Sequence, residues 1–170
     1  MSSLGLVAGI RPGGAVAHDG QRADRHFLEF VVDGQPLGRV LGPFLGYGDV
    51  TEEYVSVLVT DWPTGIALDD LERLLGAAGT EELDGRTALY VCAECGDLGC
   101  GAVTAVVEVD GPKVVWREIG YQNDYEPFEE SAVFAGAGPF VFDRKEYSAV
   151  LERFRSSVTR TQLNDGDAPE

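Results

Sequence analysis

The sequence predicts an α+β domain built on a mostly antiparallel sheet of about six strands, packed by one internal helix and one C-terminal helix. Three observations predict this class: short strand-like runs joined by Asp-Gly turns, one stretch of helical period inside the chain, and a stronger one near its end. A chain of 170 residues suits one domain, which buries roughly 70% of the surface that its unfolded form exposes.

The first half of the chain contains a predicted hairpin, a third strand and the internal helix. "HFLEFVV" and "PLGRVL" flank Asp33–Gly34, where glycine tolerates the positive φ of a tight turn. "EYVSVLVT" alternates, with its valines on one expected face. In "IALDDLERLLG" the period becomes helical, so we expect a helix over about residues 67–76, ended by Gly76 or Gly79.

The second half contains three more predicted strands and the strongest helix. "TALYV" leads into the cysteine segment, and "AVTAVVEV" and "KVVWREI" form a hairpin through "DGP". The C-terminal helix is expected over about residues 144–158, because Asp143 and Glu146 have the spacing of a capping box and an apolar stripe follows. The stripe consists of Tyr147, Val150, Leu151, Phe154 and Val158.

The two ends of the chain lack a sustained period. Residues 1–25 are rich in glycine and alanine and are expected to be an irregular N-terminal arm. Residues 26–158 then form a single α+β domain, and residues 159–170 a disordered acidic tail.

Negative charge is concentrated in the middle of the chain. The net charge is -16, and the stretch from Asp49 to Glu130 has nineteen acidic residues against four basic ones. This field repels phosphate backbones and anionic lipids, so we expect no nucleic acid and no membrane partner, while a basic protein partner is favoured. No apolar run reaches the roughly 20 residues of a membrane span and no signal sequence is visible, which favours a cytoplasmic location.

All three cysteines of the chain lie in "YVCAECGDLGCGAV". An odd number excludes a fully paired disulfide framework within one chain. Cys92, Cys95 and Cys100 have C-x2-C-x4-C spacing with Gly96 directly after the second cysteine, which matches one half of a zinc ribbon. The sequence therefore predicts a candidate metal site, with zinc as its cofactor.

The fourth metal ligand and two alternative interpretations stay open. Glu94 and Asp97 are near enough in sequence to supply an oxygen ligand, whereas His18 and His26 lie far upstream. A redox Cys-x-x-Cys pair is a second interpretation, although glycines replace the usual helix and nearby acids raise the thiol pKa. In the third, the cysteines are small buried residues of a glycine-rich turn.

The sequence contains no nucleophile elbow, phosphate-binding loop, dinucleotide fingerprint or zincin motif, and this disfavours an enzyme. A long polar and aromatic loop, "YQNDYEPFEE", instead offers contact area and hydrogen bonds for a partner. The candidate partner-binding residues are Tyr121, Asp124, Tyr125, Glu126, Glu129 and Glu130.

The part of the chain from Tyr90 to Phe154 resembles a group of small bacterial proteins without an established activity. The shared features are the C-x2-C-G segment followed by G-C, the "VVW" of the next hairpin, and "PFVFDRKEY" at the start of the last helix. The resemblance implies a shared domain and no particular function.

Two functions are expected from these patterns. The first is that of a small acidic binding protein that captures a cationic protein, as an immunity protein neutralises a basic toxin. The alternative is a zinc- or thiol-dependent enzyme that uses Cys92, Cys95 and Cys100, with an open metal position for water or substrate.

Overall fold

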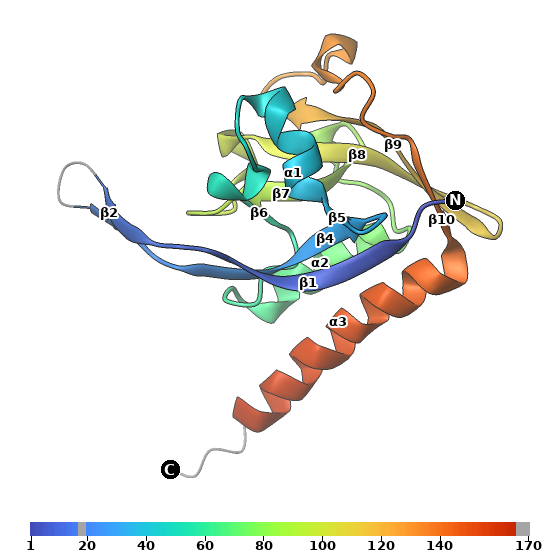
Figure 1. Cartoon of the computed structure of the whole chain (residues 1–170). Helices are drawn as coiled ribbons and strands as arrows, with labels where there is room; N and C mark the ends of the chain where they lie inside the picture. Colours follow the sequence, from blue (N-terminus) through green and yellow to red (C-terminus); the bar gives the residue numbers. More distant parts are fainter. Residues whose placement is uncertain (17–19, 166–170) are drawn as a thin grey trace.

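The computed structural model describes residues 1–16 and 20–165 and confirms the α+β class (Figure 1). Two antiparallel sheets carry the fold: a five-stranded sheet of order β10-β9-β8-β7-β6 and a three-stranded sheet of order β1-β4-β5. The strands are β1 (Leu4–Arg11), β2 (Gly14–Val16), β3 (Gly20–Arg22), β4 (Arg25–Val32), β5 (Gln35–Pro36), β6 (Tyr54–Ser56), β7 (Thr87–Cys92), β8 (Ala102–Asp110), β9 (Lys113–Gln122) and β10 (Phe140–Asp143). The α-helices are α1 (Leu37–Leu41), α2 (Thr64–Leu74) and α3 (Arg144–Asp165), and the 3-10 helices are η1 (Gly42–Leu45), η2 (Val50–Glu52), η3 (Glu81–Leu83), η4 (Leu98–Cys100) and η5 (Glu130–Ala132).

The predicted N-terminal arm is largely a strand, which corrects the expectation of an irregular segment. β1 pairs with β4 along its whole length, from Leu4 opposite Val32 to Arg11 opposite Arg25. Because this partner lies far along the chain, no local hydrophobic periodicity predicts β1. Figure 1 shows the two strands continuing beyond the rest of the molecule as a ribbon that ends at β2. The part of the arm at residues 17–19, which includes His18, lies outside the described residues.

The first hairpin forms where it was predicted, but its second strand is short. Asp33 and Gly34 both have positive φ, 52° and 80°, as this turn requires. The strand expected in "PLGRVL" is limited to β5, and the chain then enters α1. Leu37 and Leu41 are one helical turn apart and fully buried, so burying both side chains on one face favours the helix.

β6 and the residues that follow it, up to Val59, connect the two sheets. Val55 pairs with Val91 of the five-stranded sheet, whereas Val59 bridges to Phe27 of the three-stranded sheet. Both faces of this segment are therefore buried, including Ser56 and Leu58, which the alternating pattern had put on the other face.

The hydrophobic core lies between the two sheets and is closed by α3. Phe30 of β4 makes edge contacts with Tyr90 of β7 and Trp116 of β9, with ring centroids 5.9 Å and 5.3 Å away. Trp116 donates a hydrogen bond through Nε1 to the hydroxyl of Tyr147 in α3, and that hydroxyl donates to the Leu74 carbonyl at the end of α2. These contacts fix both helices against the five-stranded sheet.

Both predicted helices form, with shifted boundaries. α2 begins at Thr64 and ends before Gly76, whose φ of 115° stops the helix as expected. α3 begins with the predicted cap, because Asp143 Oδ1 accepts the Glu146 N–H at 3.0 Å. It continues to Asp165, which corrects the expectation of a tail from residue 159; residues 166–170 lie outside the described residues. No helix within the described residues is long and apolar enough to cross a bilayer.

Candidate metal centre

The three cysteines lie on one tight loop between β7 and β8. Cys92 ends β7, and η4 places Cys100 at its last position. Gly96 adopts a φ of 68° and donates its N–H to the Cys92 carbonyl at 2.9 Å, which turns the chain back after Cys95. Asp97 then caps η4 by accepting the Gly99 N–H at 2.7 Å. This local sequence brings the third thiol back to the first two.

The sulfur atoms form a group of the size that a metal ion requires. All three Sγ atoms lie within 4.8 Å of one another, and those of Cys95 and Cys100 are 3.6 Å apart. For a tetrahedral zinc with Zn–S bonds of about 2.3 Å, the sulfur–sulfur edge is about 3.8 Å. The thiols therefore lie close enough together to hold a metal ion.

Backbone donors point at the sulfur atoms. The Asp97 N–H donates to Cys95 Sγ at 3.4 Å. Burial raises the pKa of Cys92, but N–H donors of Cys95 and Glu94 and the neighbouring thiols outweigh it, so the pKa falls below its usual value. The hydrogen bond with Cys95 has the opposite effect on Cys100 and raises its pKa to about 11. The loop thus favours the thiolate form of Cys92 and the protonated form of Cys100, and a metal bound to Cys100 would displace its proton.

No fourth ligand joins the three thiols among the described residues. Glu94, one of the two predicted oxygen ligands, is instead paired with Arg11 and Arg22, with N···O distances of 2.5 Å and 3.1 Å. Asp97 is used as the cap of η4. His26 lies near Asp61, with Nδ1 3.2 Å from a carboxylate oxygen. Among the described residues, the candidate ligand set therefore consists of three thiols, one fewer than a closed tetrahedral zinc site uses.

Three arginines of the N-terminal strands hold the residues between Cys92 and Cys95. Besides its ion pair with Glu94, Arg11 is itself buried and donates to the Ala23 carbonyl. Arg25 donates to the Ala93 carbonyl at 2.8 Å, and Arg22 also pairs with Glu53. We call Arg11, Arg22 and Arg25 the arginine clamp. The positive charge of the clamp would partly compensate the negative charge of three thiolates.

The other two interpretations of the cysteine segment fit the structure less well. The buried-turn interpretation is wrong for Cys95 and Cys100, which are exposed, while Cys92 is half-buried. The redox interpretation expects a helix directly after the pair, but a turn and the short η4 follow. The convergence of the three thiols is compatible with a metal ion.

The predicted partner-binding loop lies beside the cysteine loop. The Tyr121 hydroxyl donates to the Cys100 carbonyl at 3.3 Å and also lies 3.3 Å from the Tyr54 hydroxyl. Asp124 is close to Gly99, because a Cβ atom built there would be 3.4 Å from Asp124 Oδ1. The structure therefore brings two separately predicted groups of residues together at the same end of the strands β7, β8 and β9.

The rest of the loop is ordered by its own side chains and stays at the surface. Asn123 accepts the backbone N–H groups of Tyr125 and Glu126 at 3.2 Å and 2.9 Å, an Asx-type turn. Tyr125 is 71% exposed. Glu129 and Glu130 are also exposed, at the start of η5, which follows the edge of β9.

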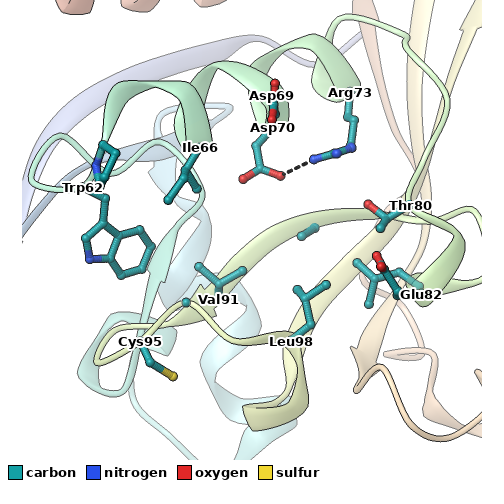
Figure 2. Close-up of a pocket in the computed structure, with 14 residues that line it drawn as sticks. Trp62, Ile66, Asp69, Asp70, Arg73, Thr80, Glu82, Val91, Cys95 and Leu98 are labelled. Atoms are coloured by element: carbon teal, nitrogen blue, oxygen red, sulfur yellow. Dashed lines mark hydrogen bonds and ion pairs between the residues drawn. The ribbon is translucent and has the colours of Figure 1, made fainter.

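Two features of this region carry no signal in the sequence. The arginine clamp joins residues about 70 to 80 positions from their contacts, and nothing in the local pattern connects them. A cavity between α2 and β7, which has Cys95 and Gly96 in its wall, likewise forms from segments that are separate in the chain (Figure 2).

Comparisons with known proteins give no relative for this chain: no family model, no curated protein and no solved structure matches it. The resemblance to small bacterial proteins therefore stays an expectation.

Proposed function

We propose that the protein binds one zinc ion through the thiolates of Cys92, Cys95 and Cys100 and leaves the fourth coordination position to an exchangeable ligand. The observation that carries this proposal is the convergence of three sulfur atoms within 4.8 Å, two of them exposed. Zinc is favoured over calcium or magnesium because thiolates are soft ligands and the hard cations take oxygen.

The ligand set favours binding over hydrolysis. Three thiolates around Zn²⁺ leave a net charge of about -1, whereas catalytic zinc sites that ionise water commonly have neutral histidine ligands. A donor group of a partner or small molecule, placed in the open position, suits this charge better than a metal-bound hydroxide.

Metal analysis of the full chain, purified without a histidine tag, tests the proposal. We expect one zinc per chain, three thiols protected from a thiol reagent in the native protein, and loss of protection after chelation. Cobalt substitution adds a count of ligands, because sulfur-to-cobalt charge-transfer bands weaken as each cysteine is changed to serine. A metal-free protein whose two exposed thiols react at once, also after incubation with zinc, would contradict the proposal.

A second candidate function, capture of a basic protein in the manner of an immunity protein, rests on the acidic loop beside the metal site. Asp124 and Glu126 are exposed next to Tyr125, and Asp124 borders the cysteine loop. Charge complementarity at such a surface would increase the rate of association with a cationic partner.

A lysine homopolymer serves as the probe for this second function. A variant without the four acids of the loop should bind the lysine homopolymer more weakly at low salt and with a smaller salt dependence. Its substitutions are Asp124→Asn, Glu126→Gln, Glu129→Gln and Glu130→Gln. The control changes four exposed acids elsewhere: Glu81→Gln, Glu82→Gln, Glu108→Gln and Asp110→Asn. If both sets weaken binding equally, only net charge matters and the loop is not a specific surface.

A further inference from the structure

The cavity between α2 and the five-stranded sheet has the size of a small-molecule site. Its volume is about 370 Å³, within the range of ordinary ligand pockets. Figure 2 shows the cysteine loop along one side, with the Cys95 thiol turned away from α2. Cys95 therefore belongs to the cavity wall while its thiol points away from α2.

Most of the cavity wall is apolar. Val91 of β7 and Leu98 of η4 form one side, and Ile66 of α2 faces them (Figure 2). Trp62 lies at one end, where its ring also meets the Arg25 guanidinium at 5.3 Å from the centroid. A ligand body the size of one ring would bury apolar surface against these side chains.

One carboxylate points into this apolar space with an unused oxygen. Asp70 extends from α2 into the cavity (Figure 2), and its side chain is only 19% exposed. Oδ1 accepts a hydrogen bond from Arg73 Nη1 at 3.1 Å, whereas Oδ2 has no hydrogen-bond partner in the described part of the chain. A carboxylate oxygen that lacks a protein donor, on a side chain that is mostly buried but open to the cavity, is a natural partner of a cationic group.

The electrostatics of the Asp70 carboxyl favour a cationic partner. Burial raises the pKa of Asp70 to about 6 even though Arg73 acts in the opposite direction. Asp69 and Glu82 also border the cavity, and among the described residues of its wall only Arg73 is basic. Because Arg73 is already paired with Asp70, the space repels anions and attracts cations.

We propose that this cavity binds a small organic ammonium compound with a ring-sized apolar body, the ammonium group paired with Asp70 and the body held between Trp62 and Val91. The ammonium donates to Oδ2, so the ion pair between Asp70 and Arg73 is kept. This proposal does not rest on the zinc proposal, since none of the contacts with the ligand uses a thiol.

Three probes of similar shape and different charge test this proposal on the full chain: phenethylamine, phenethyl alcohol and 3-phenylpropanoate. Each is titrated while ¹H–¹⁵N spectra are recorded, with the Trp62 indole and the Gly96 amide as reporters. We expect saturable shifts at these two signals with phenethylamine and affinity about tenfold weaker for the neutral alcohol, because a charge-assisted hydrogen bond is lost. Equal affinities for all three probes, preference for the propanoate, or no shifts at these signals would overturn the proposal.

A pair of variants separates Asp70 from the general negative charge. Asp70→Asn keeps the shape and should reduce phenethylamine affinity about tenfold while leaving the affinity for the alcohol unchanged. Asp110→Asn, at an exposed position in the β8–β9 hairpin, removes the same charge and should change neither. Equal losses in the two variants would assign the selectivity to net charge and contradict an ammonium site at Asp70. The spectrum of each variant also shows directly whether it is folded.

Discussion

Arg11 and Glu94 are 83 residues apart in the chain and form an ion pair of 2.5 Å between Nη1 and Oε1. Arg11 is almost completely buried, and Glu94 is the residue directly before Cys95. The pair connects the β1–β4 ribbon to the middle of the Cys-x-x-Cys segment. The orientation of the first two thiols therefore depends on strands at the other end of the sequence.

Replacing Arg11 should weaken metal binding. Arg11→Met keeps the apolar part of the side chain but removes the donors to Glu94 and Ala23. Loss of a group that orients a metal-bearing loop typically reduces metal affinity by about tenfold or more. Zinc competition with a chelator measures this. Arg39→Met, at an exposed arginine outside the clamp, is the control; equal zinc affinity in the Arg11 variant and wild type would contradict the role of the clamp.

Stability should fall as pH rises through the range in which Glu29 ionises. Burial raises the pKa of Glu29 from 4.5 to about 7, even though Oε1 accepts hydrogen bonds from the Tyr90 hydroxyl and the Phe30 N–H. Between these two values the folded protein binds more protons than the unfolded chain, so the free energy of unfolding decreases with rising pH. This one group accounts for at most roughly 3 kcal/mol.

Urea unfolding across this pH range tests the Glu29 prediction. Glu29→Gln cannot ionise, so its free energy of unfolding should fall less between about pH 5 and pH 8 than that of the wild type. Glu81→Gln, an exposed neutralisation, should keep the wild-type slope. If Glu29→Gln has the same slope as wild type, the buried carboxyl is not responsible.

Two glycines of the cysteine segment should respond differently to alanine. Gly101 has a φ of 94°, and a Cβ atom there would lie 1.8 Å from the Tyr121 hydroxyl. Gly101→Ala should therefore cost at least about 2 kcal/mol in the free energy of unfolding and displace Tyr121 from Cys100. At Gly99 the nearest atom would be 3.1 Å away, on the Asp97 side chain, and φ needs no glycine, so Gly99→Ala is the milder change. Equal losses of stability in urea would contradict the steric argument.

Removal of the Tyr147 hydroxyl should destabilise the protein through two lost hydrogen bonds. This hydroxyl accepts from Trp116 Nε1 at 3.0 Å and donates to the Leu74 carbonyl at 2.6 Å, all in the buried core. Tyr147→Phe leaves both groups without a partner and should cost about 2 to 4 kcal/mol in the free energy of unfolding. Tyr125→Phe, at an exposed tyrosine, should leave the urea midpoint unchanged. A midpoint for Tyr147→Phe equal to that of wild type would mean that the Trp116 and Leu74 groups find other partners.

Elements with a strong local signal could be predicted from the sequence. The turn at Asp33–Gly34 and the cap at Asp143 depend on residues a few positions apart, and both form as expected. β1 could not be predicted in this way because its stability comes from pairing with β4, which begins more than ten residues later. α1 replaced a predicted strand because tertiary burial of Leu37 and Leu41 decides its conformation.

The candidate site was likewise only partly predictable from the sequence. The spacing of the three cysteines predicted that their thiols could meet, since one loop carries all of them. The sequence could not predict that Glu94 is held by arginines, or that Tyr121 lies against Cys100, because both contacts depend on how the two sheets and their loops come together. The cavity around Asp70 needs α2, β7 and η4 to be placed together and has no sequence pattern of its own.

The cysteine loop has one further consequence, because it borders both of the proposed sites. Cys95 contributes a thiol on one side, and with Gly96 and Leu98 it forms part of the cavity wall on the other. If a bound metal restricts this loop, the free energy of filling the cavity changes with it. By thermodynamic reciprocity, a cavity ligand changes metal affinity by the same factor as the metal changes the affinity of that ligand. A molecule that never touches the sulfur atoms could in this way set how tightly the protein holds its metal.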